Sequence, residues 1–192
     1  AMAASRYDYS KRTLKSMKEL AGVGNYPVIG MNTALPMRDA AQMNGFLMHA
    51  LDFDDTHVAG VLHATCTALP TLLAMGQKYS ISGRELLIAY LAAIEVDARI
   101  GMAAKGGFHR KGFHPTGVVG AFGAAVAGGK VANISIPQLI HAQGIVLSMA
   151  SGTLGFLEEG AWNKRLHAGW ASVAGITAVE LSKNGFQGPS RP

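Results

Sequence analysis

The fold of this chain is decided by residues 115–127, PTGVVGAFGAAVA. Proline at the first position is typical of a helix start, and glycine then returns every three residues, at Gly117, Gly120 and Gly123. Glycine costs about 1 kcal/mol in a helix relative to alanine, so its repetition predicts a neighbour whose backbone approaches closely. We therefore expect this segment to be a central helix with other helices packed around it.

Six further segments have the apolar period or the boundary residues of helices. Ser82 and Glu85 form the sequence pattern of a capping box, and Ser135 with Pro137 opens another helix. The loop at residues 25–30 is a candidate for a short strand, and only residues 28–33 show strand-like alternation. The sequence predicts an all-α fold, a compact bundle of about six to seven helices with Gly/Ala-rich central helices, in a single domain over residues 1–192. The further helices are expected at about 10–20, 36–51, 67–78, 86–104, 135–151 and 163–185.

The composition excludes several classes of protein. Hydrophobic residues make up 49% of the 192 residues, which excludes disorder. Aromatic residues make up only 7% and no stacking motif is present, so the net charge of +5 does not indicate nucleic-acid binding. The longest uncharged stretch, residues 131–157, is interrupted by polar residues and predicts a buried helix rather than a membrane span. With Cys66 as the one cysteine, no internal disulfide can form, and we expect a cytoplasmic setting.

Three carboxylates stand out in the motif DFDDTH, residues 52–57. A haloacid dehalogenase nucleophile would need a buried strand before it, whereas the preceding residues have a helical pattern. A Mg²⁺ site, or the Asp-x-Asp-Asp acid of a terpene cyclase, is a second interpretation, although no second carboxylate cluster is present to share a diphosphate-bound metal. A third is that Asp54 and Asp55 cap the next segment.

Histidines and a lysine elsewhere favour an acid-base pocket instead. His63 follows the motif by a few residues and is expected to return toward its carboxylates. His114 lies at a helix start beside Thr116, and Lys164 with His167 shares one face of the first turn of the last helix. Helix starts attract anions. Together these residues predict a pocket that binds a polycarboxylate and moves protons.

Three motifs, in order along the chain, resemble the MmgE/PrpD family. They are NGFLMHALDFDDTH at 44–57, GFHPTG at 112–117 and KRLHAGWA at 164–171. The family includes 2-methylcitrate dehydratase, cis-aconitate decarboxylase and an iminodisuccinate epimerase. The similarity runs from about residue 22 to residue 189, and it implies a helical domain that carries most of an active site.

The resemblance places the family's active-site positions on Asp52, Thr56, His63, His114 and Lys164. It implies that His114 and Lys164 bind substrate carboxylates, that His63 transfers a proton and that Asp52 orients or tunes its neighbours. His57, Thr116 and His167 are expected to contact the substrate. No metal and no organic cofactor are implied.

The implied function is that of a lyase, most simply dehydration of a small polycarboxylate of the 2-methylcitrate dehydratase type. Decarboxylation or epimerisation within the same family is an alternative, and so is a structural or dimerisation module. A homodimer is expected. Two departures matter: Ala64-Thr65-Cys66 stands where the family usually has Pro-Ser after the histidine, and family members are more than twice as long, with an earlier helix and a C-terminal α+β domain. The chain therefore resembles the helical half of such an enzyme and is expected to be a fragment.

Overall fold

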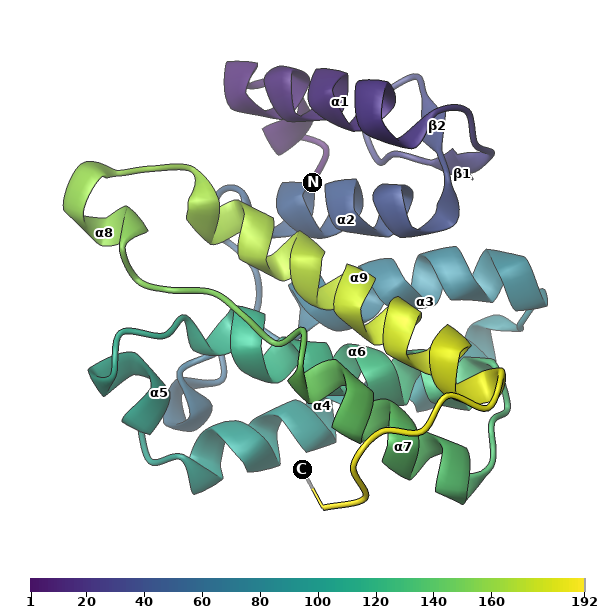
Figure 1. Ribbon diagram of the computed structural model, residues 1–192. Helices are drawn as coiled ribbons and strands as arrows, with labels where there is room; N and C mark the ends of the chain where they lie inside the picture. The colour runs from purple at the N-terminus through teal and green to yellow at the C-terminus, as the bar shows by residue number, and fades with distance from the viewer. Residues whose placement is uncertain (192) are drawn as a thin grey trace.

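The computed structural model describes residues 1–191. Its elements are mostly helices joined by short loops (Figure 1). In chain order they are η1 (Ala4–Arg6), α1 (Asp8–Ala21), β1 (Tyr26–Pro27), β2 (Ala34–Leu35), α2 (Met37–His49), η2 (Val58–Gly60), α3 (Thr65–Tyr79), α4 (Gly83–Ala103), α5 (Gly107–Arg110), α6 (Pro115–Val131), α7 (Ile136–Leu147), α8 (Phe156–Glu159) and α9 (Asn163–Lys183).

The predicted all-α fold is confirmed. Within residues 1–191 there are nine α-helices, and the two shortest, α5 and α8, have four residues each. The longer ones correspond to the segments expected from the sequence. The capping box is formed, because Ser82 Oγ accepts from the Glu85 amide and the Glu85 carboxylate accepts from the Ser82 amide. The two strands form one small antiparallel sheet.

Helix α6 lies at the centre, as its glycines predicted, and each glycine admits a different neighbour. A Cβ on Gly117 would lie 2.6 Å from the carbonyl oxygen of Ser151, one on Gly120 would lie 2.5 Å from Thr67 of α3, and one on Gly123 would meet Asp97 of α4. Figure 1 shows α6 behind the long diagonal helix α9 and in contact with α4. The glycines therefore allow several elements to pack directly on one helix.

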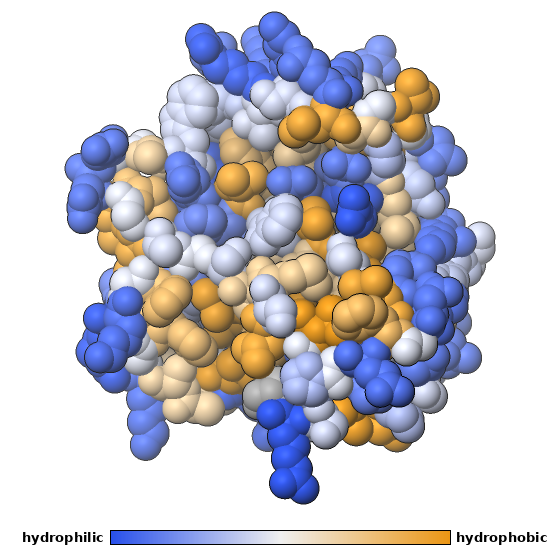
Figure 2. Space-filling model, viewed as in Figure 1, coloured by the Kyte–Doolittle hydropathy of each residue, from blue (hydrophilic) through white to orange (hydrophobic). Residues whose placement is uncertain are grey.

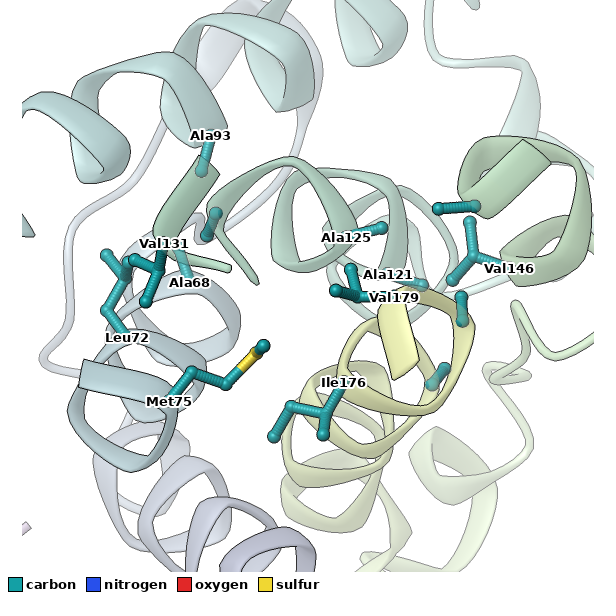
Figure 3. Close-up of a cluster of buried hydrophobic side chains, with 14 of the residues drawn as sticks. Ala68, Leu72, Met75, Ala93, Ala121, Ala125, Val131, Val146, Ile176 and Val179 are labelled. Carbon is teal, nitrogen blue, oxygen red and sulfur yellow. The ribbon is translucent and has the colours of Figure 1, made fainter. Parts of the chain in front are cut away.

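The main hydrophobic core surrounds α6 and is built largely from small side chains. Figure 3 shows Ala121 and Ala125 of α6 facing Ile176 and Val179 of α9, with residues of α3, including Met75, nearby. Alanine and glycine leave little side-chain volume between helices, so the helix axes approach closely. The position of α9 is thereby fixed along its length.

Two predicted boundaries are wrong. Residues 28–33 form the turn between β1 and β2 rather than a strand, because Gly30 adopts a left-handed φ of 73° and the Ile29 amide donates to the side chain of Asn44 instead of to a strand. The helix expected to reach Ser151 ends at Leu147. The chain leaves the helix there because the Ser151 carbonyl packs on Gly117 and the Gly152 carbonyl accepts from the amide of His114.

The surface differs between the two ends of the molecule. Figure 2 shows hydrophilic residues at the top, where α1 carries exposed Lys11, Lys15 and Lys18, and apolar residues gathered over the lower half, where α7 lies. None of the helices in the described part of the chain is both long and apolar enough to cross a lipid bilayer.

Candidate active site

The acidic motif at residues 52–57 lies in the loop that follows α2. This helix ends at His49, and Asp52 adopts a left-handed backbone with φ of 59°, which residues other than glycine seldom occupy. The turn brings the carboxylate of Asp54 back to the end of α2, 2.8 Å from the His49 ring. The loop lies at the left of Figure 1, where the starts of α6 and α9 face the end of α2.

Lys164, in the first turn of α9, is the cation that meets this motif. Its Nζ donates to both carboxylate oxygens of Asp52, at 2.6 Å each. The approach is possible because Gly169 of α9 lies against the backbone of Gly45 in α2. Burial on its own would raise the pKa of Asp52, but the hydrogen bond and charge of Lys164, with the nearby histidines, outweigh it and lower that pKa. Asp52 is therefore ionised at neutral pH and paired with an ammonium group.

A buried pair, His49 and Asp54, lies beside this ion pair. The side chain of His49 is 0% exposed and that of Asp54 is 7% exposed. Burial would raise the pKa of Asp54, yet the hydrogen bond from His49 and the charges of His49 and His63 lower it below the ordinary value. Sequence reasoning missed both residues as members of the site. The available signal was a histidine at the last position of an apolar helix, five residues before an aspartate.

His63 lies between the two carboxylates. Its Nε2 is 3.7 Å from Asp52 Oδ1 and its Nδ1 is 3.7 Å from Asp54 Oδ1. The hydroxyl of Thr56, which is exposed, lies 3.5 Å from Nδ1. The backbone amide of His63 donates to the buried hydroxyl of Thr116, at 3.1 Å, which fastens this loop to α6. His63 is thus the imidazole best placed to carry a proton between carboxylates.

His114 and His167 form a second pair of imidazoles. His114 precedes Pro115, the first residue of α6, as predicted, and its Nδ1 is 3.2 Å from Nδ1 of His167 in α9. Burial, followed by the charge of His49 and of other nearby cations, lowers the pKa of His114 to about 2. Burial and the charge of His49 also lower the pKa of His167. Phe156 packs edge-on against both rings.

The two helix starts that the sequence predicted to attract anions therefore differ in charge. The start of α9 carries a positive charge through Lys164, whereas the start of α6 presents the neutral imidazole of His114 at physiological pH. A neutral imidazole binds a carboxylate by donating one N–H hydrogen bond. The site thus combines one fixed cation with a neutral hydrogen-bonding group.

A cavity of about 150 Å³ opens between these residues. Its size suits a small molecule rather than a polymer. Four predicted site residues contribute to its polar lining, His63, His114, Thr116 and Lys164, and His109, which was not predicted as a site residue, contributes as well. Its apolar lining includes Val61, Leu154, Phe156 and Leu157.

His57 does not line this cavity. Its Nδ1 accepts from the Gly60 amide at 3.0 Å and caps η2. Asp55 likewise has a structural part, because its carboxylate accepts from the amide of Thr65 at the first turn of α3. The capping interpretation of the acidic motif is therefore correct for Asp55, while Asp52 and Asp54 face histidines and a lysine.

Four residues could offer ligands to a metal. The donor atoms of His49, Asp52, Asp54 and His63 all lie within 4.8 Å of one another. Lys164 Nζ, however, lies on both oxygens of Asp52, where a cation would bind, and the Nδ1 of His49 is engaged by Asp54. The carboxylates of this cluster are already paired with the chain's own residues. A divalent ion would therefore have to displace the ammonium group of Lys164 from Asp52.

Comparison with known proteins gives one consistent family. A sequence model described as the MmgE/PrpD N-terminal domain matches residues 1–192. A cis-aconitate decarboxylase-like protein of Aspergillus oryzae is 29% identical over 195 residues, covering 97% of this chain and 40% of that protein. Human cis-aconitate decarboxylase is 36% identical over 160 residues, covering 80% of this chain and 32% of the human protein. The enzyme of Aspergillus terreus is 28% identical over 193 residues, which is 39% of its length. The chain thus spans two fifths or less of these relatives.

Proposed function

Because this chain belongs to the MmgE/PrpD family, we propose that the protein containing it is a lyase that decarboxylates a small unsaturated polycarboxylate of the cis-aconitate type. The observation that carries the proposal is the cavity in which Lys164, His63 and His114 meet. One cation, one proton carrier and one neutral hydrogen-bond donor suit a substrate with several carboxylates. The names of the similar proteins, all cis-aconitate decarboxylases or like them, favour decarboxylation over the other reactions of the family.

The reaction needs a group that stabilises negative charge. When a carboxylate next to an allylic carbon leaves as CO₂, the electron pair of the broken carbon–carbon bond spreads over the double bond onto a second carboxylate. Lys164 is placed to stabilise that charge, since a preorganised cation in a partly buried site is worth several kcal/mol in a transition state. In the free site its partner is Asp52, so a substrate carboxylate would replace Asp52 at Nζ.

The reaction then needs a proton at carbon. His63 lines the cavity and has a carboxylate 3.7 Å away on each side, which stabilises it while it carries the proton to be donated. His114 would hold a further substrate carboxylate by its N–H. No electron is transferred to or from the protein in this sequence of steps.

Dehydration of the 2-methylcitrate dehydratase type, expected from the sequence, stays a prediction. It uses the same cation and imidazole but requires an additional acid for the departing hydroxyl group. A homodimer also stays a prediction, and the alternative that the isolated 192-residue chain is a catalytically inactive structural module stays open.

Turnover of the complete protein tests the proposal. We expect incubation with cis-aconitate to release CO₂ and to give an unsaturated dicarboxylate visible by NMR, both before and after treatment with EDTA. Turnover of a hydroxy-tricarboxylate without turnover of cis-aconitate would instead identify a dehydratase. For the 192-residue chain, tricarboxylates should raise the melting temperature while monocarboxylates do not. No shift with any of them would favour a purely structural module.

A further inference from the structure

Only one of the two carboxylate oxygens of Asp54 forms a hydrogen bond to another side chain within residues 1–191. Its Oδ2 accepts from His49 Nδ1 at 2.8 Å. Its Oδ1 is buried and has no hydrogen-bond partner among the described residues, and it lies 3.7 Å from Nδ1 of His63. Leaving a buried carboxylate oxygen unpaired costs free energy, so a slight closure of the site onto His63 would be favourable.

The surroundings of Asp54 keep its carboxylate ionised. His49 is fully buried, so it cannot touch a substrate, and its Nδ1–H must be the donor because an ionised carboxylate only accepts. The thiol of Cys66 lies nearby but donates to the carbonyl of His63, and burial followed by the charge of Asp54 raises its pKa, so it stays neutral. His49 is thus the group that holds Asp54 in place and in its charged form.

Two acceptors compete for the Nδ1 of His63. The Thr56 hydroxyl lies at 3.5 Å and the Asp54 carboxylate at 3.7 Å. A carboxylate is the stronger acceptor, and Asp54 is held by His49, whereas Thr56 is exposed and free to rotate. The other ring nitrogen, Nε2, faces Asp52, the residue that holds Lys164.

We propose that Asp54, held by His49, is a positioning residue that accepts a hydrogen bond from His63 Nδ1–H and so leaves His63 Nε2 as the atom that exchanges a proton with the substrate. In other acid-base sites a carboxylate likewise holds the catalytic imidazole in one tautomer, and the wrong tautomer costs most of the rate. The effect on turnover rests on the proposed function, whereas the tautomer of His63 does not.

The substitution Asp54→Asn gives a directional test. His49 Nδ1–H still needs an acceptor, so the new amide oxygen faces His49 and the new NH₂ group faces His63. An NH₂ group offers only donors, which forces Nδ1 of His63 to accept and moves its proton to Nε2. Asp55→Asn is the matched control, because Asp55 is next in sequence and, within the described part of the chain, its side chain accepts hydrogen bonds only from the amide of Thr65.

Nitrogen-15 NMR of the histidine rings in the 192-residue chain reads this tautomer directly. We expect neutral His63 to be the Nδ1–H form in the unmodified chain and in Asp55→Asn, and the Nε2–H form in Asp54→Asn. An Nε2–H form in the unmodified chain would overturn the proposal without any variant, and so would an unchanged tautomer in a folded Asp54→Asn chain.

Kinetics of the complete protein separate this role from mere support of the fold. Asp54→Asn should lower kcat by on the order of a hundredfold or more with little change in KM, and Asp55→Asn should retain turnover. A change in KM with an unaltered kcat would count against the positioning role. If the tautomer changes as expected but cis-aconitate is never turned over, the decarboxylase function fails and the positioning of His63 stands.

Discussion

Lys164 Nζ lies 2.6 Å from each carboxylate oxygen of Asp52, although the two residues are 112 positions apart in the sequence. The Asp52 side chain is 54% exposed, and ion pairs of that exposure contribute roughly 1 kcal/mol or less to stability. The pair therefore does little for the fold. Its effect is to hold an ammonium group in the lining of the cavity, where, in the proposed function, a substrate carboxylate takes the place of Asp52.

We expect Lys164→Ala to lower kcat/KM by on the order of a hundredfold or more, because the cation that stabilises developing charge is lost. The melting temperature should fall by only about 4 °C or less. Lys78→Ala is a matched control, since Lys78 forms an equally short ion pair with Glu180 away from the cavity. Near-normal turnover by Lys164→Ala would remove Lys164 from the site.

His114 should act as a neutral hydrogen-bond donor. Because burial and nearby charges lower its pKa to about 2, its protonation state should not change between about pH 5 and pH 8. We expect His114→Ala to lower kcat/KM on the order of a hundredfold, and His114→Lys to restore none of it even though it adds a cation. Steady-state kinetics with His114→Gln, which keeps an N–H, should show the smallest loss. Full activity of His114→Lys would mean that charge is what the position requires.

Asp97 should make the fold less stable as the pH rises. It is completely buried between α4 and α6, where Oδ1 accepts from the Gly123 amide, and burial raises its pKa well above the ordinary value. Folding thus favours the protonated acid, so stability is greatest below about pH 3.9 for this group and is lost as the pH rises through the raised pKa. Asp97→Asn carries no charge, and we expect it to melt a few degrees higher than the unmodified chain at about pH 8. Calorimetry at several pH values should show a flatter dependence for the variant, and equal slopes would contradict the prediction.

Gly120→Ala should destabilise the chain although alanine is the better helix former. The added methyl would lie 2.5 Å from the Thr67 side chain, and such overpacking costs about 1–3 kcal/mol. Gly83→Ala is the control, since nothing lies within 4 Å of its Cβ position in α4. Chemical denaturation should show a loss for the first and no loss for the second. A stable Gly120→Ala would mean that α3 can move away from α6.

Val61 should lower the stability of the fold while providing an apolar wall of the cavity. This residue lines the cavity and has a left-handed φ of 56°, an outlier for a β-branched side chain. Val61→Gly should therefore stabilise the chain, by about 1 kcal/mol or less after the entropy cost of glycine is counted. It should also raise KM by removing an apolar wall. Val58→Gly, three residues earlier in the first position of η2, should only destabilise.

The sequence predicted features that depend on neighbours along the chain. The glycine spacing of α6 indicated a central helix, Pro115 marked its start, and Ser82 with Glu85 marked the start of α4. Each of these is a local signal whose physics acts within a turn or two of helix. The roles of the candidate acid-base residues have a different origin, because they are assigned through the resemblance of three short motifs to the MmgE/PrpD family.

Features that depend on contacts across the fold were not predictable. His49 has the appearance of one more buried residue of α2 until the turn at Asp52 brings Asp54 back onto its ring. The neutral state of His114 likewise follows from burial and from charges on α2 and α9. His57, named from its place in the motif, faces its own loop because its ring caps η2. The spacing of His49 and Asp54 is visible in the sequence, but their contact depends on the left-handed turn at Asp52, which the sequence does not indicate.

The glycine and alanine surface of α6 has a consequence for how this protein can diverge. Neighbouring elements lie so close to that helix that even an added methyl group would collide with them. Larger side chains should therefore rarely be accepted there, in natural variants or in laboratory selections. Val61 and Leu157 border the cavity from loops and short helices that have room to vary. Changes in substrate preference should therefore accumulate at this rim while the helices behind it remain nearly invariant.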